Sequence, residues 1–250
     1  MKKLKFSKVA NSKLKKIKEW IDIENPKVYS FSLLSGFSCP FATDCQTYSI
    51  ANKVTGKRTL LDGKYSKYRC FSASQENQYT DTYNQRKHNF DLLLDNREHV
   101  YDMVKLINDS LPKNADIIRV HVGGDFFSSK YMLAWYSVAK INPKIKFYAY
   151  TKSIQWQVEA EQFRPSNFSM TASYGGKQDS WIDEHKIKSA RVVFHPSERN
   201  GLPIDKNEYY AINDKGSFAL LLHGTQKSGS DGSKALSRMN KEGIKYSYSK

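Results

Sequence analysis

The second half of the chain alternates short apolar segments, typical of buried strands, with segments whose apolar residues recur at helical spacing. Strands that alternate with helices predict a parallel sheet with the helices packed outside it. Six strands fit an incomplete (β/α) barrel better than the full eight-stranded form. The sequence therefore predicts the α/β class, with strands at residues 28–34, 117–122, 145–151, 168–172, 190–195 and 218–223. The corresponding helices are expected at residues 128–141, 153–163, 180–185 and 233–240.

The N-terminal part of the chain is strongly basic. Residues 1–18 contain eight lysines and no acidic residue, and we expect residues 1–27 to form a basic helical segment. Its lysines suit a phosphate backbone, although a charged face of this kind more often only contacts water. We expect the remaining residues, 28–250, to form a single barrel-like α/β domain, because no Pro-, Gly- or Ser-rich linker divides them.

All three cysteines lie in the loop at residues 35–74, directly after the first predicted strand, with the spacing C-x5-C-x24-C. Three thiolates cannot complete a tetrahedral zinc site, which needs four ligands. They can hold three corners of a [4Fe-4S] cluster through Cys39, Cys45 and Cys70 and leave one iron open. The alternative is three unrelated buried thiols, and spacing alone slightly favours it. Residues 52–64, within this loop, are expected to form a surface excursion or a hairpin.

Polar and glycine residues follow every predicted strand. Because ligands bind at the carboxyl ends of the strands in parallel α/β folds, these residues predict one site that faces one way. The candidates for binding a cofactor or substrate, besides the cysteines, are Gly123, Gly124, Asp125, Lys152, Ser173, His195 and His223.

Each candidate has a structural alternative. Asp125 suits a ligand amine or a proton transfer, but it could also be the N-cap of the next helix, a place that Ser128 can take. Gly123 and Gly124 permit close approach of the backbone, or they form a plain turn. Lys152 suits an anionic ligand, or it is a solvated lysine.

Two of the histidines have the same kind of alternative. His195 and His223 each end an apolar strand, where a histidine can be a fourth cluster ligand, an acid or base, or a hydrogen-bonded core residue. Two histidines at matching strand ends favour a site, and with Asp125 they are the candidate catalytic residues. His121 lies within a strand, and we expect it to be structural.

The cysteine loop after the first strand and the Gly123-Gly124-Asp125 motif after the second resemble the radical SAM half-barrel. The resemblance implies a [4Fe-4S] cluster on the three cysteines, with S-adenosylmethionine (SAM) on the open iron. It further implies that the motif, usually Gly-Gly-Glu, helps to hold the methionine amino group. The cysteine spacing departs from the superfamily's C-x3-C-x2-C.

A second resemblance covers nearly the whole chain. The segments SCPFATDC, YRCFSAS, RVHVGGDFFSSKY, FYAYTKS and HGTQKSGS occur in this order and are similar to the phage family called "gene product 88". This resemblance implies a phage or mobile-element protein with an iron–sulfur site on a radical-SAM-like barrel, and it favours the cluster over unrelated thiols.

Charge and composition limit the classes of partner and the compartment that fit this chain. The net charge of +15 predicts a polyanionic partner, most often nucleic acid, although an AT-rich, lysine-rich code explains it equally well. No apolar run is long enough to cross a membrane, and an odd number of cysteines is typical of a reducing cytoplasm, here the bacterial host's. Two hypotheses remain. One is a radical or cluster-dependent enzyme acting on a nucleotide or nucleic acid, and the other is a nucleic-acid-binding protein with a structural cluster.

Overall fold

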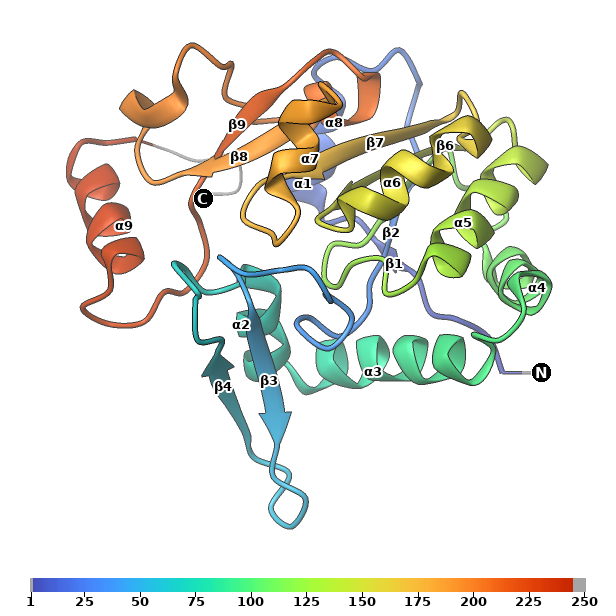
Figure 1. Ribbon diagram of the computed structural model, residues 1–250, viewed down its shortest axis with the longest axis horizontal. Helices are drawn as coiled ribbons and strands as arrows, with labels where there is room; N and C mark the ends of the chain where they lie inside the picture. Colours follow the sequence, from blue (N-terminus) through green and yellow to red (C-terminus); the bar gives the residue numbers. More distant parts are fainter. Residues whose placement is uncertain (1, 245–250) are drawn as a thin grey trace.

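A computed structural model describes residues 2–244. Within this range seven strands form one sheet, in the order β1-β2-β5-β6-β7-β8-β9 (Figure 1). The six strands from β2 to β9 are mutually parallel and follow chain order, while β1 is antiparallel to β2. The strands are β1 (Ser7–Lys8), β2 (Val28–Phe31), β5 (Ile117–Val120), β6 (Lys146–Thr151), β7 (Phe168–Ser173), β8 (Ser189–Val193) and β9 (Phe218–Leu221).

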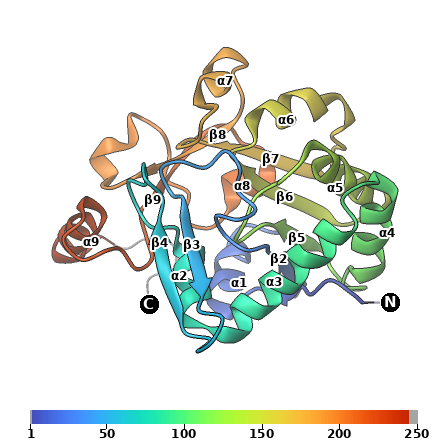
Figure 2. The same cartoon turned by 60° about the horizontal axis from the view of Figure 1, so that its bottom comes forward.

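Helices cover both faces of the sheet. Figures 1 and 2 show α4, α5, α6 and α7 along one face, and α1 and α8 on the other. The helices are α1 (Asn11–Ile17), α2 (Phe71–Gln78), α3 (Thr80–Asp95), α4 (Val100–Ser110), α5 (Ser129–Ile141), α6 (Ile154–Ala160), α7 (Asp179–Glu184), α8 (Tyr209–Asn213) and α9 (Asp231–Lys241). Two 3-10 turns, Glu161–Phe163 and Pro196–Arg199, complete the set within the described residues.

Each face of the sheet has its own core. The larger core joins α4 and α5 to the strands through large side chains such as Trp135, Phe147 and Phe168, all fully buried. The smaller core lies on the opposite face and contains Ile17 of α1 and Ile212 of α8. Because both faces are covered, the central strands are apolar or buried nearly throughout, as parallel strands usually are. This is why they could be predicted from sequence.

The basic N-terminal segment is built into this fold. Ser7 and Lys8 pair with Ser30 and Tyr29 of β2, so the segment adds an edge strand that the sequence did not reveal. Leu4 and Ile17, from either side of β1, are buried in the two cores. Residues 1–27 therefore contribute a strand as well as a helix.

The α/β class and the largely parallel sheet are confirmed. The sheet has two edge strands within the described residues, β1 and β9. Of the surface excursion or hairpin expected at residues 52–64, the structure has a hairpin that begins earlier in the chain, as β3 (Thr47–Ala51) paired with β4 (Arg58–Asp62). In Figure 1 this hairpin projects away from the sheet. No helix found between residues 2 and 244 has the length and apolar character that crossing a bilayer requires.

Candidate functional site

A cavity of about 460 Å³ lies at the carboxyl ends of the parallel strands. It is lined by residues that come from the cysteine loop, from the ends of the strands and from the N-terminal segment. Cys39, Cys45 and Cys70 all line it, although they are distant in the sequence. The other predicted residues that line it are Gly123, Gly124, Asp125, Lys152, Ser173 and His223. The structure thus brings together every sequence-predicted site residue except His195.

The loop that carries Cys39 and Cys45 is fixed to the turn after β7. The backbone N–H groups of Thr43 and Asp44 both donate to the carbonyl oxygen of Gly175, at 3.1 and 3.0 Å. Gly175 has a φ of +94°, and a Cβ there would lie 2.9 Å from the Cβ of Asp44. Glycine is therefore required where the two loops meet, and this contact positions the first two cysteines over the strand ends.

The hairpin explains the long spacing before the third cysteine. Strand β3 begins two residues after Cys45, and β4 returns the chain toward the start of α2. Cys70 is the N-cap residue of α2, and its backbone N–H donates to Thr47 Oγ1 at 3.2 Å. The 24 residues between Cys45 and Cys70 therefore form an excursion that leaves the cavity and comes back to it.

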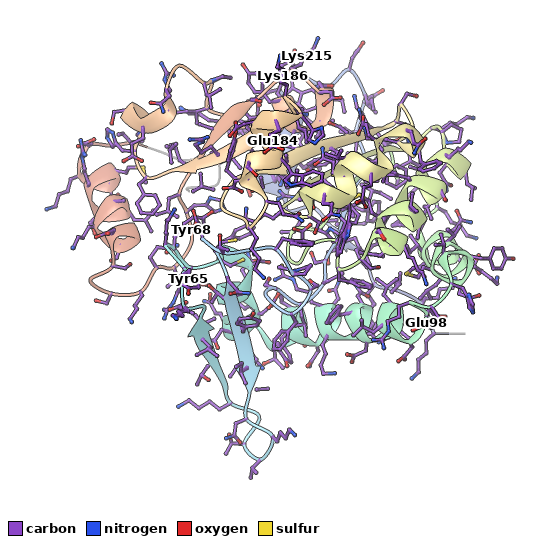
Figure 3. All side chains as sticks on the ribbon, viewed as in Figure 1. Tyr65, Tyr68, Glu98, Glu184, Lys186 and Lys215 are labelled. Carbon is purple, nitrogen blue, oxygen red and sulfur yellow. The ribbon has the colours of Figure 1, made fainter. Side chains whose placement is uncertain are left out.

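Figure 3 labels Tyr65 and Tyr68 on the segment that connects β4 to α2. Tyr65 is exposed at the surface, whereas Tyr68 lines the cavity. The Tyr68 ring centroid lies 6.1 Å from that of Phe194, in an edge-on arrangement. Tyr68 therefore adds an aromatic wall beside the cysteines. No sequence motif had indicated that this tyrosine belongs to the site.

The Gly123-Gly124 pair touches both cysteine segments. A Cβ on Gly123 would lie 2.2 Å from Ser72 Oγ, two residues after Cys70. A Cβ on Gly124, where φ is +85°, would lie 2.5 Å from Ser38 Oγ, directly before Cys39. The glycines are therefore needed for close approach, and the alternative of a plain turn does not account for their packing.

Asp125 is buried and accepts three hydrogen bonds. Its Oδ1 accepts from Phe126 N and Thr151 Oγ1, and its Oδ2 accepts from Lys152 N, each at 2.7 Å. Burial raises the pKa of Asp125 to about 6, against the opposing effect of these hydrogen bonds. Ser128, and not Asp125, caps α5, because Ser128 Oγ accepts from Tyr131 N. Asp125 therefore joins the ends of β5 and β6 beside the cysteines.

Lys152 is not a solvated lysine, because only 7% of its surface is exposed. Its Nζ donates to Ser173 Oγ at 2.6 Å and to the carbonyl oxygen of Tyr174 at 2.8 Å. Burial raises the pKa of the Cys45 thiol, and the same ammonium group, which lies nearby, opposes that rise. Lys152 therefore places a positive charge between the cysteine loop and the ends of β6 and β7.

The two histidines differ in location. His223 lines the cavity, its ring centroid lies 4.8 Å from that of Phe71, and burial lowers its pKa. His195 does not line the cavity. Its Nε2 lies 2.7 Å from Glu242 Oε2, and its Nδ1 bonds Ser197, so it joins the end of β8 to α9. The two histidines, which follow neighbouring strands and were expected to share one site, therefore do not share it.

His121 lies in the cavity wall, although we expected it to be only structural. It follows β5 with a φ of +65°, in the left-handed region, and its Nε2 lies 3.0 Å from Tyr131 Oη. Burial, followed by the charge of Arg119, lowers the pKa of His121 to about 3, so the ring is neutral at physiological pH. One sequence signal pointed to this position. Residues two apart in a strand share a face, so the spacing from Arg119 to His121 indicates that the two side chains face the same way.

Burial raises the pKa of all three cysteine thiols. The pKa of Cys39 lies well above its ordinary value, and nearby Asp125, Cys70 and Cys45 raise it further. Burial also raises the pKa of Cys45. Burial and Cys45 raise the pKa of Cys70 to about 11, while backbone N–H groups at the start of α2 oppose the shift. Thiolates are the iron-binding form, so iron binding would release these protons.

Three thiols are a donor set that an iron–sulfur cluster can use. Within residues 2–244 no group of three or more histidine, cysteine or carboxylate side chains is arranged to hold a metal ion. In a [4Fe-4S] cluster each thiolate binds a different iron, so the sulfur atoms surround a volume. Three cysteines around one cavity match that requirement.

The fold and the site together define an α/β protein with three cysteines at the carboxyl ends of a parallel sheet. The chain belongs to the Gene product 88 family, whose sequence model matches residues 3–241. It is also similar to the Gene 88 protein of Mycobacterium phage L5, with 30% identity over 127 residues. That match covers 47% of this chain and 44% of the relative, so it spans less than half of the relative's length. No solved structure matches the chain.

Proposed function

We propose that this chain is a phage-encoded iron–sulfur enzyme that acts on a nucleotide or nucleic acid from a radical-SAM-like half-barrel. One observation carries the proposal. Three cysteines from two separate segments line one cavity, with Gly123, Gly124 and Asp125 packed between them. Unrelated buried thiols have no reason to meet at the carboxyl ends of the parallel strands, where ligands bind in α/β folds.

Cys39, Cys45 and Cys70 would hold the [4Fe-4S] cluster. A cluster with an open iron can bind SAM and transfer an electron to it, and this is the chemistry that the group would supply. The chain's own residues shape the surroundings. Lys152 places a cation beside Cys45, and Tyr68 lines the cavity near Cys45 and Cys70. The order of the strands, with six parallel neighbours in chain sequence, supports the half-barrel.

Iron content tests the cluster. Protein reconstituted anaerobically with iron and sulfide is expected to bind about four irons per chain, and each Cys→Ala variant is expected to lose them. Conversion of Tyr65, an exposed tyrosine of the same loop, to Phe is the control and should leave the iron content unchanged. Protein that binds one zinc and no iron would contradict the proposal.

Electron paramagnetic resonance of the reduced protein, recorded with and without SAM, tests the radical chemistry. A change in the cluster signal on adding SAM is expected if SAM binds the open iron. If the signal does not respond, the cluster binds its substrate directly or is structural. Cys45→Ala separates those cases, because loss of a structural cluster unfolds the chain, while loss of a functional one leaves it folded and inactive.

The net charge of +15 supports the second candidate, a nucleic-acid-binding protein with a structural cluster. In that case binding weakens steeply with salt, because counterions are released from the phosphates. Deleting residues 1–18 cannot test this, since it removes buried Leu4 and Ile17. We expect the double variant Lys3→Gln/Lys15→Gln, at exposed positions, to reduce the slope of log affinity against log salt concentration by about 1.4 units for a single strand.

The matched control removes two exposed lysines at and just after the end of α5, at positions 140 and 144. Filter binding of a single-stranded oligonucleotide across a range of salt concentrations gives the slopes. If both double variants change the slope equally, the N-terminal lysines have no special role. If wild-type affinity does not depend on salt, the charge does not reflect nucleic-acid binding.

A further inference from the structure

The β3–β4 hairpin has one covered face and one exposed face. Tyr48 is paired with Leu61, and Ile50 lies two residues after Tyr48, so these three side chains share one face. Ile50 is 40% exposed and Leu61 is 55% exposed, and we call this side the outer face. The other face packs against α2, where Arg58 Nε donates to the carbonyl oxygen of Glu76 at 2.9 Å. Figure 1 shows the hairpin away from the main sheet, so its outer face is accessible.

An aromatic ring from the cysteine loop extends the outer face. Phe37 lies two residues before Cys39, and its ring centroid is 5.1 Å from that of Tyr48 in an edge-on arrangement. Gly36 permits this close approach, because its φ is +76° and a Cβ there would lie 2.6 Å from the carbonyl oxygen of Thr47. Phe37 is nevertheless 49% exposed. The outer face therefore continues from the hairpin to the loop that carries the cysteines.

A second exposed ring lies near the base of the hairpin. Tyr65 follows β4 and is exposed at the surface, where Figure 3 labels it. The Nζ of Lys64 lies 5.2 Å from the centroid of this ring. A cation held beside an exposed ring can contact a phosphate and a base together.

The acidic residues of this region are already paired. Residues 37–68 contain only two of them, Asp44 and Asp62. Asp44 Oδ2 lies 3.0 Å from the Nζ of Lys67, and Asp62 Oδ2 lies 2.9 Å from Nη2 of Arg69. Neither carboxylate is therefore left to balance the other cations of the hairpin.

Three exposed lysines of the hairpin region have no carboxylate partner within the described part of the chain. They are Lys53, Lys57 and Lys64. The backbone N–H of Asn52 donates to the carbonyl oxygen of Lys57 at 2.8 Å, which extends the ladder by one pair. Because side chains alternate along a strand, this pair lies on the same face as Ile50. The outer face thus combines apolar side chains, an aromatic ring and positive charge.

This combination favours one kind of occupant. A second copy of the chain carries the same net charge of +15, so like charges oppose self-association through this face. A nucleic-acid strand offers phosphates to the lysines and flat bases to the ring and the apolar side chains. In a duplex the bases are paired and stacked on each other, so their faces are not available to Phe37. A single strand presents them.

We infer that the outer face of the β3–β4 hairpin binds single-stranded nucleic acid. Phe37 stacks on a base, and Lys53 and Lys57 contact phosphates toward the tip of the hairpin. The inference rests on the proposed function for the reaction and names its substrate as a single strand. Because Phe37 belongs to the cysteine loop, a strand held there lies beside the cysteines.

Fluorescence anisotropy with labelled oligonucleotides tests the interface on the full chain. The probes are a single strand of about 16 nucleotides as DNA, the same sequence as RNA, and the DNA duplex. We expect at least one single strand to bind at least about tenfold more tightly than the duplex. Comparison of the DNA and RNA strands shows which sugar is preferred.

Phe37→Ala removes the ring and is expected to weaken binding of the single strand at least about fivefold. Phe37→Trp keeps a ring and should restore most of the affinity, provided that both variants melt as the wild type does. Phe163→Ala is the matched control, because Phe163 is 58% exposed but lies in the turn after α6. Its affinity should equal that of the wild type.

The lysines are tested by the salt dependence of binding. Lys53→Gln/Lys57→Gln should reduce the slope of log affinity against log salt concentration by about 1.4 units for a single strand. The control is the double variant at the exposed lysines 140 and 144, which should keep the slope of the wild type.

Equal losses in Phe37→Ala and Phe163→Ala would overturn the inference, and so would a duplex that binds as tightly as the single strands. If no oligonucleotide binds, the face serves a protein partner and the inference fails. Sedimentation of the protein alone checks for a second copy, because a dimer that Leu61→Lys dissociates would assign the face to self-association.

The anisotropy titration is repeated on iron-free and on reconstituted protein, because the outer face contains no cysteine. Strand binding by a chain that takes up no iron refutes the proposed function and leaves the interface standing. Iron uptake without strand binding refutes the interface alone.

Discussion

Replacing Glu76 with alanine is expected to destabilise the chain by about 3–5 kcal/mol, because it leaves the buried charge of Arg86 uncompensated. Glu76 is fully buried on α2, and its Oε1 lies 2.9 Å from Nη1 of Arg86 on α3. Glu76 also accepts hydrogen bonds from the backbone N–H and the hydroxyl of Ser35. Thermal unfolding should show a melting temperature lower by on the order of 10 °C.

The same change is expected to impair the site. Ser35 begins the loop that carries Cys39 and Cys45, and Arg86 donates to Ser72, two residues after Cys70. The Glu76–Arg86 pair therefore holds both cysteine segments at once. Iron uptake during anaerobic reconstitution should fall in Glu76→Ala even at temperatures where the chain remains folded.

Asp91→Ala is the matched control. Asp91 pairs with Lys87 on α3, the helix that carries Arg86, but both side chains are half exposed. Exposed pairs of this kind contribute less than about 1 kcal/mol, so the variant should melt close to the wild type. If Glu76→Ala melts no lower than Asp91→Ala, the buried pair does not hold the cysteine segments, and their placement depends on other contacts.

Much of the sheet could be predicted because its strands are buried on both faces. Phe218–Leu221 is apolar at every position and buried at three of four, and such segments are recognisable as continuous apolar runs. Parallel strands place all their carboxyl ends at one edge, so the residues that follow them meet without any further information. This rule predicts that Gly124, Lys152 and His223 lie close together, and in the structure all three line one cavity.

The rest depends on contacts that leave no periodic pattern. β1 has only two residues, and its position comes from pairing with β2. In the sequence Lys13 looks like the other lysines of its segment. In the structure it pairs with buried Glu208, which is distant in the sequence. His195 follows an apolar strand just as His223 does, but its partner Glu242 lies directly after the last helix. Tertiary contacts of this kind cannot be inferred from one short segment.

Asp125→Asn is expected to destabilise the chain by about 1–3 kcal/mol and to weaken ligand binding near the cysteines. Both carboxylate oxygens accept hydrogen bonds, from Phe126 N and Thr151 Oγ1 on one side and from Lys152 N on the other. An asparagine keeps one oxygen, so its amide group must face at least one of these donors. That donor is then buried without a hydrogen-bond acceptor.

The change also removes the only carboxylate that lies between Lys152 and Cys39 in the described cavity wall. We therefore expect the SAM-dependent change in the cluster's resonance signal to weaken while iron still binds. Asp116→Asn is the control, because Asp116 Oδ2 also accepts from a backbone N–H at 2.7 Å, that of Lys27, but at the surface. A folded Asp125→Asn chain with wild-type stability would show that these hydrogen bonds do not constrain the strand ends. A SAM response equal to that of the wild type would show that Asp125 serves the fold alone.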